Sequence, residues 1–302
     1  MQKIQYVLVV VLIIVVVALA VAIAVVKPDL GSSSEGTSTE TPGGNTDVLQ
    51  NSGKPSQTDE VPDSTEAPTA EPTPDAQKPL KGLVVCIDAG HQGQQNKEKE
   101  PCAPWGKDAN SSVNNEVMKT KCASGTTGRF TGIPEFEVTL DISLKMQAEL
   151  EKLGATVVMI RETHDVNLSN KERAEIGNNA KADVVLRIHC NGAESESAQG
   201  IELYVRDKGD NTAEYKARSD SDFALASELL GYLIDKTNAK NRGVKKSDNY
   251  TGTNWSEVPS IIIECGFMSN ETEDNLLVSA EYQQKIADAV ANWCVNSKLL
   301  NK

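Results

Sequence analysis

Three residues that can bind a metal ion or move a proton stand at the ends of strand-like apolar runs. His91 and His189 each follow or close a run rich in valine, isoleucine and leucine, and Glu264 follows three consecutive isoleucines. Ligands of an open α/β sheet gather at the carboxyl ends of its strands, so we expect these side chains to meet. A carboxylate at the end of a buried strand loses water, which is costly unless a cation or hydrogen bonds compensate.

Two imidazoles and one carboxylate are a common ligand set for a catalytic zinc ion (Zn²⁺), with the fourth position left to water. The carboxylate could come from Glu135, Glu137 or Glu264. Glu135 and Glu137 open an expected helix, where the helix dipole favours acids that have no catalytic role. Residue types and spacing leave all three candidates open. The remaining histidine, His164, lies in a polar loop and is predicted to be a surface residue.

Strand-like and helix-like segments alternate along the second part of the chain. We expect strands at residues 83–88, 155–161, 183–190, 201–206 and 259–265, and helices at 135–153, 169–180, 222–236 and 281–299. Ser169 and Glu172 have the spacing of a capping box, which begins a helix. This order predicts an α/β fold, with a mainly parallel twisted sheet and helices on both of its faces.

The first 80 residues differ in composition from the rest. Residues 6–26 form an unbroken apolar run of about 21 residues, which is long enough to cross a bilayer and longer than a typical signal-peptide core. We therefore expect a transmembrane anchor in residues 1–27, with a cleavable signal peptide as the alternative. Residues 28–80, rich in Ser, Thr, Pro and acidic residues, predict a disordered linker, and residues 81–302 predict one folded domain. The net charge of −13 argues against nucleic acid as a partner.

The six cysteines fall into two groups. Cys102 and Cys122 lie in a polar segment without helical or strand periodicity. On the outside of a cell they would be the favoured disulfide, closing a loop of about 20 residues, and two free thiols are the alternative. No Cys-x-x-Cys motif occurs, which argues against a cysteine zinc site. The others are predicted to be buried apolar residues: Cys86, Cys190, Cys265 and Cys294.

Four separated motifs, in this order, resemble the zinc-dependent N-acetylmuramoyl-L-alanine amidases (amidase type 3), which cut bacterial peptidoglycan. They are IDAGH at 87–91, EFEVTL at 135–140, RIHCN at 187–191 and IECGFMSN at 263–270. Arg161 and Arg173 are among the supporting matches, and the resemblance covers roughly residues 82–296. It implies an enzyme that hydrolyses the amide bond between N-acetylmuramic acid and L-alanine.

The resemblance also assigns roles to single residues. It maps zinc ligands onto His91, Glu135 and His189, and the catalytic carboxylate onto Glu264. In this mapping Glu135 is preferred to Glu137 because the family's ligand stands five positions before a helix leucine, here Leu140. Glu264 would take a proton from water and return it to the departing amine, while zinc polarises the carbonyl. Asp88 is a candidate to orient a ligand histidine, and capping the end of its strand is the alternative role.

The sequence departs from the family pattern in several places. Gln92 stands where a glycine is common, and Cys190 and Cys265 replace commoner small or apolar residues. The segment 92–134 is long, and we interpret it either as a specificity loop or as a plug over the cleft. Two alternative functions remain: a zinc peptidase acting on another cell-wall bond, and a wall-binding module without catalysis.

The expected partners are peptidoglycan and, through the N-terminal helix, the cell membrane. The catalytic domain is expected on the extracytoplasmic side, and cleavage of the N-terminal segment would instead give a secreted protein. A flexible linker would let a tethered domain reach wall polymer outside the membrane.

Overall fold

The computed structural model describes residues 78–109 and 111–300, which belong to a unit spanning Pro68–Lys302. The expected anchor, residues 1–27, and nearly all of the expected linker, residues 28–80, lie outside the described residues. Within the described part, no helix combines the length and apolar character needed to cross a membrane. Leu80 is already buried in the core, and its amide donates to the Leu153 carbonyl at 3.0 Å.

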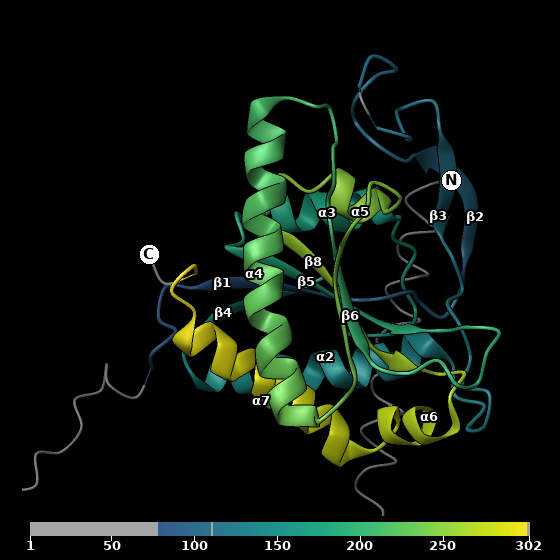
Figure 1. Ribbon diagram of the computed structural model, residues 1–302, viewed down its shortest axis with the longest axis vertical. Helices are drawn as coiled ribbons and strands as arrows, with labels where there is room; N and C mark the ends of the chain where they lie inside the picture. Colours follow the sequence, from purple (N-terminus) through teal and green to yellow (C-terminus); the bar gives the residue numbers. More distant parts are fainter. Residues whose placement is uncertain (1–77, 110, 301–302) are drawn as a thin grey trace, which may run out of the picture. The chain divides into compact units, whose positions relative to one another are not determined.

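A six-stranded sheet lies at the centre of the described region (Figure 1). All its neighbouring strands pair in parallel except β6 and β8, which are antiparallel. The mainly parallel sheet expected from the alternation of strands and helices is therefore present. In spatial order its strands are β4 (Thr156–Met159), β1 (Val84–Ala89), β5 (Val184–Asn191), β8 (Ser260–Phe267), β6 (Ile201–Val205) and β7 (Asn241–Lys246).

Helices cover both faces of this sheet, as the sequence predicted. One face packs against α2 (Glu135–Lys152), α4 (Ala213–Thr237) and α7 (Ala280–Asn296), and the other against α3 (Asn170–Asn179) and α5 (Thr251–Asn254). Figure 1 shows α3 and α5 on one side of β1 and β5, with α2 and α7 on the opposite side. The alternation of side chains along β5 explains both contacts: Leu186 and Ile188 join the larger core, whereas Val185 faces the smaller one.

The helix starts differ in how well local signals predicted them. The capping box of Ser169 and Glu172 forms at the start of α3, as expected. Helix α4 begins at Ala213, well before the expected residue 222, and Thr212 caps its first turn. The sequence missed this start because the first turns are mostly polar and show no apolar period. The sequence also missed β7, α5 and α6 (Glu271–Leu277), which are short or lack a clear apolar period.

The segment 92–134 contains an antiparallel hairpin that the sequence did not predict. Its strands are β2 (Asn96–Pro101) and β3 (Met118–Cys122). Apart from Pro101, Met118 and Cys122, both strands consist of lysine, glutamate and other polar residues, and most of these are exposed or half-buried. A two-stranded ribbon of this kind has no apolar alternation to reveal it.

The register of this hairpin rules out the expected disulfide between Cys102 and Cys122. Pro101 lies opposite Met118, whereas Cys122 lies opposite Asn96, so the two cysteines stand at opposite ends of the ribbon. Four strand positions span about 13 Å, which is far more than the roughly 7 Å limit between the Cα atoms of a disulfide. Both cysteines are buried free thiols, and the disulfide prediction was wrong.

Candidate metal centre and catalytic carboxylate

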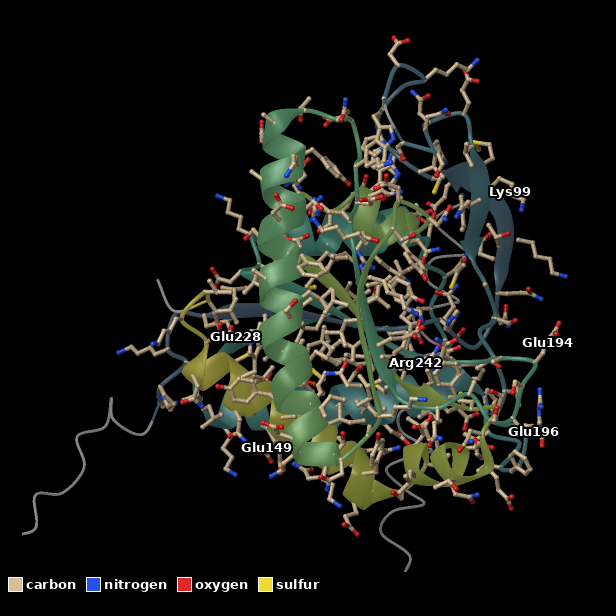
Figure 2. All side chains as sticks on the ribbon, viewed as in Figure 1. Lys99, Glu149, Glu194, Glu196, Glu228 and Arg242 are labelled. Atoms are coloured by element: carbon tan, nitrogen blue, oxygen red, sulfur yellow. The ribbon has the colours of Figure 1, made fainter. Side chains whose placement is uncertain are left out.

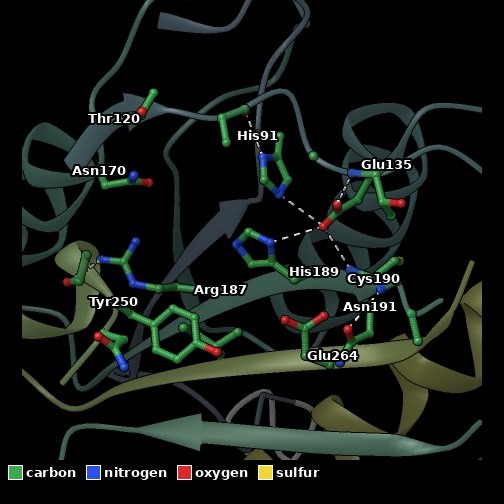
Figure 3. Close-up of a pocket in the computed structure, with 18 of the residues that line it drawn as sticks. His91, Thr120, Glu135, Asn170, Arg187, His189, Cys190, Asn191, Tyr250 and Glu264 are labelled. Carbon is green, nitrogen blue, oxygen red and sulfur yellow. Dashed lines mark hydrogen bonds and ion pairs between the residues drawn. The ribbon is translucent and has the colours of Figure 1, made fainter. Parts of the chain in front are cut away.

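Two imidazoles and one carboxylate converge at the carboxyl edge of the sheet. Glu135 Oε1 lies 3.2 Å from His91 Nε2 and 3.1 Å from His189 Nδ1, and the three candidate ligand atoms lie within 4.8 Å of one another. Figure 3 shows the two rings facing the carboxylate. His91 follows β1, Glu135 opens α2, and His189 lies near the end of β5. The structure thus brings together the three residues that the sequence proposed as ligands.

Glu135 is held in place from two sides. Its Oε1 accepts a hydrogen bond from the Cys190 amide at 3.0 Å, and its Oε2 accepts one from the Thr126 amide at 2.8 Å. Burial alone would raise the pKa of Glu135, but the hydrogen bonds to both histidines outweigh it and hold this pKa well below its usual range. Glu137, the open alternative on the same helix, is half-buried and does not belong to the cluster.

The hydrogen bonds of His91 fix which of its nitrogens faces the carboxylate. Its Nδ1 lies 2.9 Å from the Ala123 carbonyl, which can only accept, so Nδ1 carries a proton and Nε2 points at Glu135. Burial disfavours the charged ring, yet the hydrogen bond and charge of Glu135 outweigh it and raise the pKa of His91. For His189, burial wins and lowers the pKa.

The donor set of the cluster fits a divalent metal ion. Glu135 Oε1 only accepts, so two ring nitrogens beside it are favourable only when a proton or a cation lies between them. Two imidazoles and a carboxylate suit zinc, and they leave room for a further ligand. Both histidine side chains keep limited exposure, at 16% and 24%, so the site remains open to the cleft.

Two glycines allow the ligands to approach so closely. A Cβ on Gly90 would lie 2.8 Å from His189 Nδ1 and 2.5 Å from the Ile188 carbonyl oxygen. A Cβ on Gly125 would lie 2.8 Å from Glu135 Oε2. Both positions exclude larger residues because the space is taken by the cluster itself.

Asp88 does not orient a ligand histidine directly, so that hypothesis was wrong. Its carboxylate accepts hydrogen bonds from Arg173 at 2.6 Å and from Arg187. Burial opposes ionisation of Asp88, but the two guanidinium groups outweigh it and lower its pKa to about 2. Asp88 therefore acts as a buried counter-ion behind the site.

Two buried arginines hold the backbone that carries His91. Arg161 donates to the Ala89 carbonyl at 2.8 Å and to the Gly90 carbonyl at 2.9 Å. Arg173 donates to the Ala89 and His91 carbonyls at 3.0 and 2.9 Å. The sequence marked both arginines as motif matches but gave them no role, because their carbonyl partners depend on the folded loop.

Glu264 lies beside the cluster but outside the ligand set. Its strand position on β8 pairs with His189 on β5, and its side chain lines the same cleft (Figure 3). Its Oε2 is buried without a hydrogen-bond partner among the described residues. Burial, followed by the charges of Glu135 and Glu202, raises the pKa of Glu264 to about 8. An unpartnered carboxylate of this kind is suited to accept and release a proton.

The cluster opens into a cleft of about 750 Å³. The hairpin contributes Lys119 and Thr120 to its wall, so the long segment 92–134 borders the site. His164, which the sequence placed on the surface, is exposed, and its ring packs edge-on against the ring of Phe136. Gln92 is buried, and its Oε1 accepts from Arg173 at 2.9 Å, which gives this departure from the family pattern a local role.

Comparisons with known proteins bear on the family and the fold of this chain. The family model described as N-acetylmuramoyl-L-alanine amidase matches residues 85–294. The chain is 31% identical over 224 residues to the uncharacterized protein YqiI of Bacillus subtilis, covering 74% of this chain and 89% of that protein. It is 32% identical over 173 residues to the N-acetylmuramoyl-L-alanine amidase LytC of the same organism, a match that spans 57% of this chain but only 32% of LytC.

A solved structure shares the fold. The crystal structure of the N-acetylmuramyl-L-alanine amidase Ami1 from Mycobacterium smegmatis superimposes with a TM-score of 0.62 at 24% identity. The superposition covers 74% of this chain and 98% of that one. The shared arrangement is the mainly parallel sheet with its flanking helices.

Proposed function

Since the chain belongs to the N-acetylmuramoyl-L-alanine amidase family, we propose that it hydrolyses the amide bond between N-acetylmuramic acid and L-alanine in peptidoglycan. We propose further that the reaction depends on zinc held by His91, Glu135 and His189. One observation carries this proposal: the three ligand atoms lie within 4.8 Å of one another, beside an unpartnered carboxylate in one cleft. The activity named for the relative LytC supports it.

The chemistry divides between the metal site and Glu264. Zinc, when bound, would supply positive charge that polarises the amide carbonyl and makes water more acidic. Glu264 takes the proton of the attacking water and delivers it to the departing nitrogen. Its pKa of about 8 applies to the metal-free chain, and a nearby positive charge favours the ionised form that can accept a proton.

The remaining residues keep these groups in position. The Thr126 and Cys190 amides fix Glu135, and the Ala123 carbonyl fixes the ring of His91. Because the hydrogen bonds with both histidines outweigh burial and hold the pKa of Glu135 well below its usual range, its carboxylate stays ionised and does not compete for the proton that Glu264 transfers. The surroundings thus shift the pKa values of the two carboxyl groups in opposite directions, which separates the ligand Glu135 from the base Glu264.

Mass analysis of digested peptidoglycan tests the assignment. The zinc-loaded protein should create new L-alanine amino termini without new reducing sugars. Glu264→Ala should still bind zinc, but its kcat should fall by at least about 100-fold, because the acid–base group is gone. His189→Ala should lose zinc, which metal analysis of the purified variants measures.

Other results would point elsewhere. Near-normal turnover by Glu264→Ala contradicts its role as the base. New amino termini on residues other than L-alanine indicate a peptidase acting on a different wall bond. Absence of zinc from both wild type and His189→Ala, with wall binding intact, indicates a binding module.

We also propose that residues 1–27 anchor the chain in the cell membrane, with the catalytic region on the extracytoplasmic side. The apolar run of residues 6–26 and the polar composition of residues 28–80 support this arrangement. Peptidoglycan lies outside the membrane, so a tether on that side would keep the enzyme next to its substrate.

A further inference from the structure

The two ends of the cleft differ in charge. Figure 3 shows Thr120, Asn170, Arg187 and Tyr250 on one side of the histidines, and Cys190 and Asn191 on the other. We call the first side, together with Lys119, the hairpin end. Among the described residues that line the cleft, the hairpin end contains cations and no carboxylate.

The opposite end of the cleft has acidic character. Glu194 lines it, and Arg129 there is paired with Glu196 at 3.1 Å. Figure 2 shows Glu194 and Glu196 on a loop separate from the hairpin, which is marked by Lys99. The cleft therefore has a direction that a charged substrate can recognise.

Lys119 forms no ion pair among the described residues, although Glu100 lies opposite it in the hairpin and instead accepts hydrogen bonds from the Lys171 amide. Its side chain is half-buried, and its Nζ donates to the neutral carbonyl of Asn249. Lys121, on the same strand, instead forms an ion pair with Glu98 at 2.8 Å. The ammonium group of Lys119 therefore keeps its capacity to bind an anion from the cleft.

Arg187 adds positive charge beneath the same end. Its guanidinium donates to Asp88, to the Gly252 carbonyl at 2.8 Å and to Ser260 at 3.1 Å. Asp88 is shared with Arg173, so one carboxylate faces two arginines. Positive charge is therefore in excess behind the hairpin end, which strengthens its attraction for an anion.

We propose that the hairpin end binds a carboxylate of the stem peptide, with Lys119 as the specificity-determining residue. This inference rests on the proposed function. The peptide carries the carboxylates of such a substrate, whereas the sugar next to the scissile amide carries hydroxyl and acetamido groups. A charge-assisted hydrogen bond to Lys119 would direct the peptide toward the hairpin and the glycan toward Asn191 and Glu194.

A matched pair of substrates tests the proposal. Two muramyl peptides are used that differ only in that every peptide carboxylate of one is a carboxamide in the other. The zinc-loaded wild type should prefer the carboxylate substrate in kcat/KM by about fivefold, mainly through KM. Lys119→Met should reduce this ratio to about one, and Lys119→Arg should retain it. Lys121→Met, which removes a lysine from the same strand, should leave the ratio unchanged.

The outcomes separate the two proposals. A carboxylate preference that persists in Lys119→Met, or that is absent from the wild type, overturns the binding role of Lys119. Failure of the wild type to cleave either substrate contradicts the proposed function. In that case calorimetric binding of the two peptides to wild type and Lys119→Met still decides the carboxylate preference.

Discussion

At the scale of single residues, two adjacent carboxylates show how partners set acidity. Glu202 on β6 lies opposite Glu264 on β8. Arg242 and Lys245 bind Glu202 at 2.6 and 2.7 Å, and their hydrogen bonds outweigh burial and lower its pKa. Glu264 has no such partner, and burial raises its pKa to about 8. One acid is therefore a structural ion-pair partner, and the other is available for proton transfer.

Replacing the ionisable carboxyl group of Glu264 should change how stability depends on pH. Its folded pKa lies above the unfolded value, so the metal-free protein should lose stability as pH rises from about 4.5 to about 8. The contribution of one such group is at most about 1.4 kcal/mol per pH unit. Glu264→Gln should lose this part of the slope, which urea unfolding of the metal-free proteins at about pH 5 and about pH 8.5 measures.

Glu162→Gln, a change on an exposed loop, serves as the control for this comparison. If wild type and Glu264→Gln show the same change in stability between the two pH values, Glu264 is not held in its protonated form by burial.

At the scale of elements, loops rather than the sheet complete the metal site. His91 adopts a positive φ of 59° just after β1, and Arg161 and Arg173 hold the surrounding carbonyls. The segment between β3 and α2 contributes Gly125, whose φ is 80° and whose missing Cβ leaves space for Glu135. The site thus depends on loop backbone that tolerates little change.

Gly125→Ala should disturb the site, and Gly132→Ala provides a matched control. Both glycines have positive φ values, 80° and 71°, but a Cβ on Gly132 meets nothing within 4 Å. Each change should cost about 1 kcal/mol of stability through backbone strain. Only Gly125→Ala should also weaken zinc binding, by at least about tenfold, because its Cβ displaces Glu135 and His91.

Competition with a zinc-binding dye measures this difference, and thermal unfolding measures the shared loss of stability. Equal zinc affinity in the two variants would show that the space beside Gly125 does not matter for the ligands.

At the scale of the whole molecule, residues far apart in sequence share one site. The candidate ligands and base stand at positions 91, 135, 189 and 264, and they meet because β1, β5 and β8 are neighbours in the sheet. The proposed anchor in residues 1–27 and the linker in residues 28–80 precede all of them. Localisation and catalysis should therefore be separable.

Deleting residues 1–27 should release the protein from the membrane without reducing its specific activity on isolated peptidoglycan. The full chain should sediment with membranes and resist extraction by high salt, since an apolar span is held by lipid rather than by charge. Cell fractionation followed by immunoblotting measures the release of the deleted form and the membrane retention of the full chain. If cells that express the undeleted chain release a product shortened at its N-terminus into the culture medium, residues 1–27 instead contain a cleaved signal peptide.

Local patterns in the sequence determined most of the central strands and the type of sheet. The apolar runs predicted β1, β5 and β8, and the capping box at Ser169 predicted the start of α3, because burial and capping depend on neighbouring residues. The order of these elements predicted the mainly parallel sheet, and the motifs at their ends predicted which residues would gather.

Only the tertiary structure decided how distant residues meet. Spacing left Glu135, Glu137 and Glu264 open as the third ligand, and the packing of α2 against β5 brings Glu135 to the histidines. The register of the hairpin separates Cys102 from Cys122, and folding gives Asp88 two arginines instead of a histidine. Register and pairing depend on the free energy of the whole packed arrangement, so a pattern of nearby residues does not specify them.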